Sequence, residues 1–520
     1  MFWFIKNRPN LQGVVMERWG GVYHLFTTKA MHPEPERIWE RTVHHAISSD
    51  LLRWENQPDV LGKGAEGAFD GFTLYDLHTI HDRGRSWLFY TGLDKPPPGQ
   101  HQSIGLAISD DSRRWERHPA NPILRCDPVF YEPSLPDEAI HQEKDRGRQW
   151  FRDPWVIRDP ETGIFGMAVG ARIRGGHPDT RGCVAWATSH DLLRWTPKAP
   201  IFAPGRFHTI ECPCMFELDG HWHLVWLTHP GWGTPFTSTD PWQSAGGIFH
   251  AVSSSGLLGP YERPKEELVV GGSYATADGT RRMRTMVFRT VDGADGAIYG
   301  YYHLVTTPGF GDVVAPDDAL GRTLASQYSV MPLPKPLVSM PDGGLGLGWS
   351  PLSEGMLDRE VPLSMPLMPG WRGADGAWIG RHFTGRGALR MGELPDGGSI
   401  YAHIRFACGW RAGFELRSNG DGEGLEIVAD RQRRCLTLAR SCDGEEFIDR
   451  RSWSGKDEIE LRVAFCGPSI EIYADGCLAL HAVRYRERGT IWGLVTDHAE
   501  AQFDAISARP WQKGLRLTPE

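Results

Sequence analysis

The chain repeats a short phrase in which small and branched residues lead into a Ser/Asp turn and then a tryptophan. Three copies end at Trp54, Trp115 and Trp195, and a degraded fourth copy spans residues 249–261. Serine and aspartate side chains close tight turns because they accept hydrogen bonds from the backbone two residues further on. Each copy therefore predicts a strand, a turn and a second strand that opens with a large aromatic residue.

An aromatic-rich phrase precedes these copies, usually just after a glycine turn. Its five copies begin at Gly21, Arg85, Gly163, Gly220 and Ala297. Runs of aromatic and branched residues between turn signals are typical of β-strands. Strand units that recur at intervals of roughly sixty to eighty residues indicate a β-propeller, and five copies predict five blades. In a propeller, residues at the starts of several blades converge on one central funnel.

The C-terminal part of the chain has a different pattern. Short runs that alternate apolar and polar residues, such as residues 424–429 and 469–474, follow one another with Asp/Gly turns between them. This pattern predicts an antiparallel β-sandwich. We therefore expect an all-β protein, with a five-bladed β-propeller over residues 1–345, a linker rich in Gly, Pro, Met and Ser over 346–370, and a C-terminal β-sandwich over 371–520.

Composition narrows the class of protein and of partner. The chain has 520 residues and a net charge of −9, which argues against nucleic acid as a partner. It has no run of 18 apolar residues, so we expect no membrane span. The start at Met1 lacks a basic region, and nine cysteines without regular spacing fit reduced thiols, so we expect a cytoplasmic location. A homodimer is left open.

Two carboxylates stand beside prolines in short apolar runs, where buried strands would end. Asp153 lies in Arg152-Asp153-Pro154, and Glu211 opens Glu211-Cys212-Pro213. Glycoside hydrolysis needs two carboxyl groups held apart, one to give a proton and the other to balance positive charge on the sugar. The alternatives are a turn cap for Asp153 and a solvent-facing position for Glu211. The two motifs in this order favour a glycosidase.

The histidine pairs at positions 44/45, 78/81 and 221/223 resemble metal ligands at first sight. In strands, residues two apart share a face, but no third ligand of clear spacing accompanies these pairs. Zinc sites usually need three or four protein ligands. We therefore expect no metal and no organic cofactor.

Taken together, the repeats and motifs resemble glycoside hydrolase family 32, the invertase and fructanase family, over nearly the whole chain. The Ser-x-Asp-Leu-x-x-Trp phrases, residues 90–94, Arg152-Asp153-Pro154 and Glu211-Cys212-Pro213 match family landmarks in order. The resemblance implies a propeller that carries the active site and a sandwich that is usually not catalytic. It also implies retaining hydrolysis or transfer of fructofuranosyl units.

The resemblance also implies residue roles. Asp153 would stabilise the charged transition state and stay ionised beside Arg152, which would donate hydrogen bonds to substrate oxygens. Glu211 would be the general acid and base, with a pKa raised by burial among apolar neighbours.

The third family carboxylate, the nucleophile, is missing from its usual place. The family carries it in an Asn-Asp-Pro-Asn-Gly phrase before the first aromatic strand, whereas residues 7–13 here are Asn-Arg-Pro-Asn-Leu-Gln-Gly, and no aspartate precedes Asp50. The position that corresponds to the family nucleophile is Arg8 if this chain carries a two-residue insertion, and Gln12 if it carries none. Neither side chain can form the usual covalent glycosyl intermediate.

Three explanations remain open. Another carboxylate takes the role, or the protein binds sugar without cleaving it, or the sequence given starts downstream of the true start. For the first, Asp76 is the main candidate, because it sits in an apolar and aromatic strand where an unpaired carboxylate is costly. The alternative is that Asp76 is a structural hydrogen-bond acceptor. Glu17 is a weaker candidate for the missing carboxylate.

Four further residues complete the predicted site as substrate contacts. Asp70 and Tyr75 come from the segment that holds Asp76, His208 precedes Glu211, and Trp155 follows the Arg-Asp-Pro motif. We expect hydrolysis or transfer on small furanosides, above all β-fructofuranosides, with a short oligosaccharide as substrate. The alternatives are a related furanosidase acting on arabinose, xylose or galactofuranose units and a sugar-binding protein without hydrolytic activity.

Overall fold

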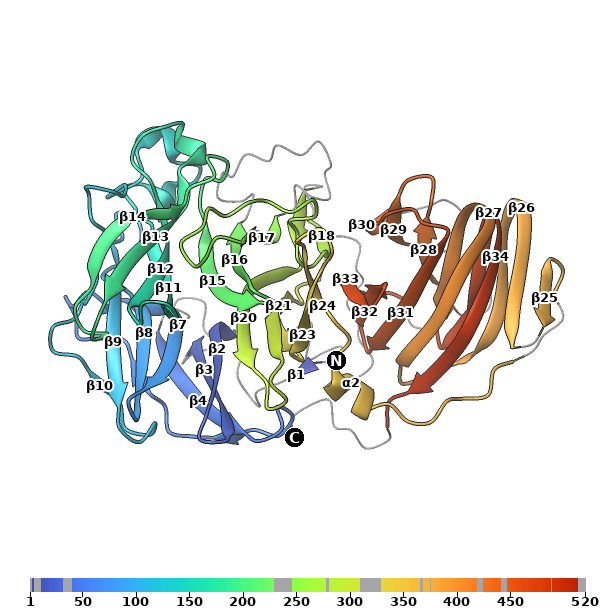
Figure 1. The fold of residues 1–520 in the computed structure, drawn as a ribbon, viewed down its shortest axis with the longest axis horizontal. Coiled ribbons are helices and arrows are strands. Elements are labelled where there is room, and N and C mark those ends of the chain that lie inside the picture. The colour runs from blue at the N-terminus through green and yellow to red at the C-terminus, as the bar shows by residue number, and fades with distance from the viewer. Residues whose placement is uncertain are drawn as a thin grey trace.

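The computed structural model is built almost wholly from β-strands, which fall into two groups that lie side by side (Figure 1). It describes residues 2–3, 11–30, 40–228, 246–276, 280–308, 329–364, 368–374, 376–418, 424–440, 447–487 and 489–512. Several small sheets form the N-terminal group, and one large bent sheet forms the C-terminal group. The prediction of an all-β propeller followed by a sandwich is confirmed. None of the described helices has the length and hydropathy needed to span a bilayer.

Five antiparallel sheets form the blades of the propeller. The first contains β2 (Leu11–Trp19), β3 (Val22–Ala30), β4 (Arg41–Ser48), β5 (Glu55–Asn56) and β6 (Leu61–Gly62). The second contains β7 (Thr73–Asp82), β8 (Arg85–Leu93), β9 (Gln102–Ser109) and β10 (Glu116–Arg117). The third contains β11 (Phe151–Arg158), β12 (Phe165–Arg172), β13 (Gly182–Ser189) and β14 (Thr196–Phe202).

The last two blades complete the ring. The fourth contains β15 (Glu211–Leu218), β16 (His221–Thr228) and β17 (Gly247–Ser253). The fifth contains β20 (Thr285–Asp292), β21 (Ile298–Val305), β22 (Ser329–Pro332), β23 (Lys335–Ser339) and β24 (Leu345–Leu347), and β1 (Phe2–Trp3) pairs with β22. A small hairpin of β18 (Ser273–Ala275) and β19 (Arg281–Met283) lies between them in sequence. The innermost strands β2, β7, β11, β15 and β20 each contact the next, and β20 contacts β2, so the ring closes.

The two repeated phrases have clear structural roles. The aromatic-rich copies form the second strand of each blade, and the Ser/Asp copies form the third strand and the turn that follows it. In the third blade, the Ser189 hydroxyl accepts a hydrogen bond from the Leu192 N–H at 2.9 Å, and the Trp195 indole N–H donates to the Leu192 carbonyl at 3.0 Å. The same contacts occur in the first blade. The phrase is therefore a self-contained turn closed by its own side chains.

The C-terminal sheet folds over on itself through two long strands. Its strands are β25 (Trp371–Ala374), β26 (Ala377–Glu393), β27 (Gly398–Ser418), β28 (Leu425–Asp430), β29 (Cys435–Arg440), β30 (Phe447–Ser452), β31 (Glu458–Cys466), β32 (Ser469–Ala474), β33 (Cys477–Val483) and β34 (Ile491–Pro510). Strand β27 pairs with β34 along most of its length, with β31 at its start and with β28 at its end. Because β27 changes partner midway, it serves both layers of the sandwich.

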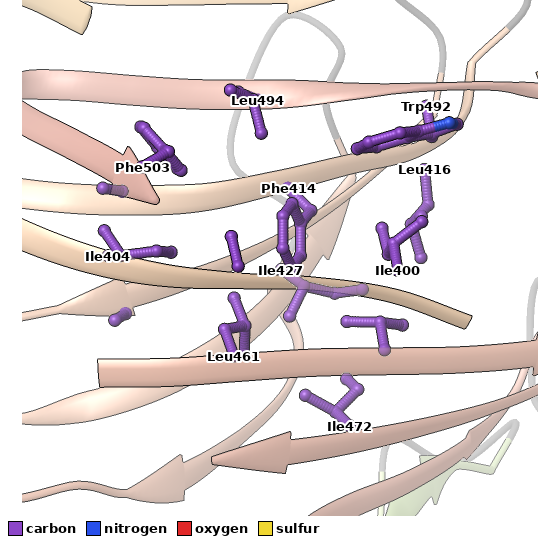
Figure 2. Packing of buried hydrophobic residues seen from close by; sticks show 14 of the residues in the cluster. Ile400, Ile404, Phe414, Leu416, Ile427, Leu461, Ile472, Trp492, Leu494 and Phe503 are labelled. Atoms are coloured by element: carbon purple, nitrogen blue, oxygen red, sulfur yellow. The ribbon is translucent and has the colours of Figure 1, made fainter. Parts of the chain in front are cut away.

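The core of the sandwich is apolar. Figure 2 shows Phe414 between Leu494 of one strand and Leu461 of another, with Ile427 and Trp492 close by. All five side chains are fully buried. Alternating strand residues point inward, as the period of two in the sequence predicts.

The two domains are joined by buried polar contacts. The Lys335 ammonium lies 2.8 Å from Glu471 Oε1, and both side chains are 1% exposed. The Tyr302 hydroxyl and His481 Nδ1 are 2.7 Å apart. Between the domains, α2 (Pro351–Gly355) follows β24, and β25 opens the sandwich at Trp371. The two contacts fix the sandwich against the fifth blade.

Candidate active site

The innermost strand of every blade carries a β-bulge near its start. The register shifts fall after Gln12 in β2, Leu74 in β7, Arg152 in β11, Glu211 in β15 and Met286 in β20. A bulge inserts an unpaired residue and turns its side chain away from the regular alternation. The bulges therefore present side chains from neighbouring blades to a common space.

Asp153 sits in the bulge of the third blade with φ of +63°, a conformation that few aspartates adopt outside turns. Its backbone N–H donates to the Thr91 hydroxyl at 2.9 Å, which links it to the second blade. Its Oδ2 accepts a hydrogen bond from the Cys212 N–H at 3.0 Å. The side chain is thus held between the bulges of two blades.

Asp76, Asp153 and Glu211 lie together and are called the carboxylate cluster below. Arg152 joins two of them, because its guanidinium contacts Glu211 Oε1 and its Nε lies 3.6 Å from Asp153 Oδ2. Carboxylate oxygens of Asp76 and Asp153 and the Cys212 sulfur lie within 4.8 Å of one another. Asp153 is 1% exposed, and Glu211 and Arg152 are each 5% exposed. The structure thus brings carboxylates from three blades into one group, in which Asp153 and Glu211 are buried and Asp76 is partly exposed.

Aromatic rings surround the guanidinium of Arg152. It lies 4.0 Å from the centroid of Trp150 and 5.9 Å from that of Tyr75. Arg41 lies on Tyr75 as well, at 5.1 Å. Burial lowers the pKa of Arg152. The predicted contact residue Tyr75 therefore borders the cluster, where its ring packs against the guanidinium groups of Arg152 and Arg41.

Asp76 occupies the space beside the bulge of the first blade. A Cβ atom placed on Gly13 would lie 3.0 Å from Asp76 Cα and 3.1 Å from its Oδ1. Burial, and next the charge of Asp153, raise the pKa of Asp76 from its usual 3.8 to about 6, against the opposing charges of Arg289, Arg152 and Arg41. Its Oδ1 and Asp153 Oδ1 have no hydrogen-bond partner among the described residues. Both oxygens can accept hydrogen bonds from a ligand.

Arg289 of β20 completes the surroundings, and sequence reasoning missed it. It is 1% exposed, and its Nη1 donates to the Cys212 carbonyl at 2.7 Å and to the Pro213 carbonyl at 3.2 Å. Its charge favours the ionised form of Asp76. The available signal was an arginine inside the branched and aromatic run of residues 287–291.

Glu17 lies elsewhere, so the structure does not support it as a substitute for the missing carboxylate. Its Oε1 is 3.6 Å from His78 Nε2. Burial, and next the charge of Asp292 at the last position of β20, raise the pKa of Glu17 to about 8. This places it at the opposite end of the inner strands from the bulges. Arg8 and the side chain of Gln12 lie outside the described residues.

Three other predicted contact residues have partners outside the cluster. Asp70 is buried and accepts hydrogen bonds from the Tyr90 hydroxyl and from Arg117 Nε, each at 2.9 Å. Trp155 is 5% exposed, and its indole N–H donates to the Met215 carbonyl at 2.9 Å, so it packs between blades. His208 is 2% exposed and lies edge-on to Trp150, one layer behind Arg152.

The arrangement has the parts that bond cleavage in a sugar requires. One carboxyl group, Asp76, has a pKa near neutrality, and two others lie beside a buried guanidinium. Buried charges act strongly because little water screens them. The cluster can therefore bind sugar hydroxyls, move a proton and balance positive charge.

The first half of the chain matches a known family model. Residues 6–280 match the model of the glycosyl hydrolases family 32 N-terminal domain. A levanase of Bacillus subtilis is 27% identical over 230 residues, which cover 41% of this chain and 28% of the levanase. A sucrose-6-phosphate hydrolase of Escherichia coli is 27% identical over 205 residues, which cover 39% of this chain and 38% of that enzyme. The matched stretch thus spans well under half of each of these relatives.

Solved structures resemble the whole fold. A family 32 β-fructofuranosidase of Bombyx mori has a TM-score of 0.66 at 15% identity, over 97% of this chain and 92% of that one. A sucrose-6-phosphate hydrolase of Lactobacillus gasseri also has a TM-score of 0.66, at 14% identity, over 97% of this chain and 91% of that one. At these identities the likeness shows the fold alone. The family model covers more than half of the chain, which therefore belongs to glycosyl hydrolase family 32.

Proposed function

We propose that the protein is a glycosidase that cleaves or transfers small β-fructofuranosides. Its family supports the reaction class, and the names of its relatives, levanase and sucrose-6-phosphate hydrolase, support the sugar. In this proposal, Glu211 is the general acid and base, Asp153 stabilises the transition state, and Asp76 supplies the third carboxylate. This chain matches less than half of each relative, so the substrate and the activity are part of the proposal.

The position of Asp76 carries the proposal. The first blade has no described carboxylate at its bulge, and Asp76 comes so close to Gly13 there that an added Cβ would lie 3.1 Å from Asp76 Oδ1. An ordinary aspartate is ionised at neutral pH, and a pKa near 6 leaves Asp76 mostly ionised there while keeping it more basic than usual. Basicity and position together suit a nucleophile or a base.

The reaction then proceeds in two balanced steps. Asp76 attacks the anomeric carbon while Glu211 protonates the departing oxygen, so a carbon–carboxylate bond forms as the glycosidic bond breaks. Glu211, now ionised, takes a proton from water or from an acceptor sugar, which attacks the same carbon and frees Asp76. Asp153 and Arg152 bind sugar hydroxyls and oxygens as charge develops. An activated water held by Asp76 gives the inverting variant of this scheme.

Arg152 sets a condition on this mechanism. Its guanidinium lies against Glu211 Oε1, whereas a general acid must present a carboxyl oxygen to the departing group. Substrate binding must therefore draw Arg152 toward the sugar and away from Glu211. This contact also favours a second candidate function, in which Arg152 stays paired with Glu211 and the site binds fructosides without cleaving them.

The test is Glu211→Gln measured beside wild type on sucrose and 1-kestose. We expect the rate of fructose release to fall by about 10²- to 10⁴-fold, the usual contribution of a general acid and base. Glu217→Gln is the matched control, because Glu217 lies on the same strand with an exposed side chain. Wild type that binds these sugars by calorimetry yet releases no fructose above the Glu211→Gln level overturns the enzyme proposal and supports the binding function.

We also propose a cytoplasmic location and a short imported saccharide as substrate. No disulfide joins the eight cysteines in the described part of the chain, which fits a reducing compartment. Fractionation of cells that produce the tagged protein tests the location, and recovery outside the cytoplasm contradicts it.

A further inference from the structure

Three potential metal ligands meet at the loops that border the third and fourth blades. His141 lies between the short 3-10 helices η2 (Asp137–Ala139) and η3 (Glu143–Asp145), Asp179 lies in η4 (Pro178–Thr180), and His208 precedes β15. The ligand atoms of these three side chains lie within 4.8 Å of one another, and His141 Nε2 is 2.7 Å from Asp179 Oδ1. They are called the His-Asp-His cluster below.

One ring nitrogen of His208 has a free lone pair. Its Nε2 is 3.0 Å from the Ala139 carbonyl, which can only accept a hydrogen bond, so Nε2 carries the proton. Nδ1 is therefore the unprotonated nitrogen, and it is buried with no hydrogen-bond partner among the described residues. The whole side chain is 2% exposed. A metal-binding histidine commonly donates its other N–H to a backbone carbonyl in this way.

The backbone around the ligands is already fixed. Arg172 is 1% exposed, and its guanidinium donates to the carbonyl of His208 and, at 2.7 Å, to that of Pro178, next to Asp179. The carboxylate of Glu132 pairs with Arg172 at 2.6 Å and also with Arg181, so one negative charge offsets half of their positive charge. The carboxylate of Asp179 supplies further negative charge for a cation at the cluster.

We propose that His141, Asp179 and His208 bind one divalent transition-metal ion, of which Zn²⁺ is the representative. Two imidazoles and one carboxylate suit Zn²⁺ and its neighbours, whereas Mg²⁺ and Ca²⁺ prefer oxygen ligands alone. Zn–N distances of about 2.0–2.1 Å place tetrahedral ligands about 3.3 Å apart. The partly exposed side chains of His141 and Asp179 can separate to that distance. Water fills the remaining position.

The ion ties three loops together at the edge of the site. His208 stands three residues before Glu211, and its ring lies edge-on to Trp150, whose ring supports Arg152. Binding should therefore order the loop that leads into β15. This inference does not depend on the proposed glycosidase activity.

The test uses full-length protein freed of metal by dialysis against a chelator and titrated with ZnCl2 in a calorimeter. We expect one ion per chain, and at least about tenfold weaker binding in His141→Ala and in Asp179→Asn. His101→Ala is the matched control, because His101 is also an exposed histidine paired with an aspartate, Asp94, at 2.9 Å, but it is not part of a described three-ligand cluster. No saturable binding by wild type, or equal binding by His141→Ala, overturns the proposal.

A second measurement separates loss of the metal site from poor folding of a variant. Co²⁺ added to the metal-free protein should give the visible absorption of a four-coordinate site in wild type and His101→Ala, and not in His141→Ala. Thermal unfolding should shift upward with Zn²⁺ in the same two proteins. Glu211→Gln should bind Zn²⁺ like wild type, so that loss of turnover and loss of metal binding are separate outcomes. Spectra alike in wild type and His141→Ala would reject the cluster.

Discussion

The first and second blades differ where their innermost strands enter the ring. Strand β2 has Gly13 at its bulge, with φ of +53°, whereas β7 has Tyr75 and Asp76 there. The two positions are neighbours in space, because Asp76 Oδ1 lies 3.1 Å from where a Cβ on Gly13 would be. In a ring of blades, a side chain from one strand can therefore fill the place that the adjacent strand leaves open.

The rest of the carboxylate cluster comes from the third and fourth blades. Asp153 and Arg152 come from β11 and Glu211 from β15, and both strands keep the bulged proline motifs. Burial, and next the charge of Asp153, raise the pKa of Asp76 on β7. A nucleophile supplied by β7 in place of β2 is therefore expected to differ both in identity and in pH dependence from one at the usual place.

Removal of the Asp76 carboxylate should have the largest effect. Asp76→Asn keeps the size of the side chain but cannot attack carbon or take a proton, so we expect kcat for fructose release to fall at least about a thousandfold. Asp82→Asn, at the other end of β7, is the matched control and should change kcat less than about twofold. Unchanged turnover in Asp76→Asn would remove this residue from the chemistry.

The pH profile sharpens the comparison further. Because the pKa of Asp76 is about 6 and its ionised form is the reactive one, kcat/KM should fall by about tenfold per pH unit below 6. The charges that face Asp76 are those of Asp153, Arg289, Arg152 and Arg41. Initial rates measured between about pH 4 and 8 report this limb. If the residual activity of Asp76→Asn falls in the same way below pH 6, the fall must come from the ionisation of another group.

Stability should respond in the opposite direction to activity. The folded pKa of Asp76, about 6, is higher than its ordinary 3.8, so the folded state binds more protons between these values. Its contribution to the free energy of unfolding is fully present below about pH 3.8 and is lost as pH rises through about 6. Asparagine does not ionise, so Asp76→Asn should be more stable than wild type above pH 6, by about 1–3 kcal/mol.

Urea unfolding at two pH values measures this difference. The gain in Asp76→Asn should be large at pH 7.5 and smaller near pH 4, where the carboxyl group of wild type is protonated too. Asp82→Asn should show no such pH-dependent gain. A destabilised Asp76→Asn at pH 7.5 would mean that the carboxylate holds the ring together rather than straining it.

The predictable parts of the molecule are those whose interactions are local in sequence. The turn at Ser189 and Trp195 closes on itself within seven residues, so its sequence pattern was sufficient to predict it. The alternating runs over residues 424–429 and 469–474 likewise predicted strands, which are β28 and β32. These features need no knowledge of which blade packs against which.

The features that sequence reasoning missed depend on contacts between blades. Trp155 was expected to contact the substrate, but its indole N–H donates to the Met215 carbonyl of the next blade. Arg289 is far from Asp76 in sequence and close to it only once the ring has closed. The His-Asp-His cluster as a whole was missed for the same reason, because His141, Asp179 and His208 lie on separate loops.

The smallest expected effect tests the space beside the first bulge directly. Gly13→Ala puts a Cβ at 3.0 Å from Asp76 Cα on a backbone with φ of +53°, so it should cost about 1–3 kcal/mol of unfolding free energy. Gly20→Ala is the control, because its φ is also positive, at +59°, but nothing lies within 4 Å of its added Cβ. If the space belongs to Asp76, Gly13→Ala should also move the acid limb of the pH profile, since it displaces the carboxylate, whereas Gly20→Ala should leave that limb in place. A shift in stability without a shift in the limb would separate the bulge from the chemistry.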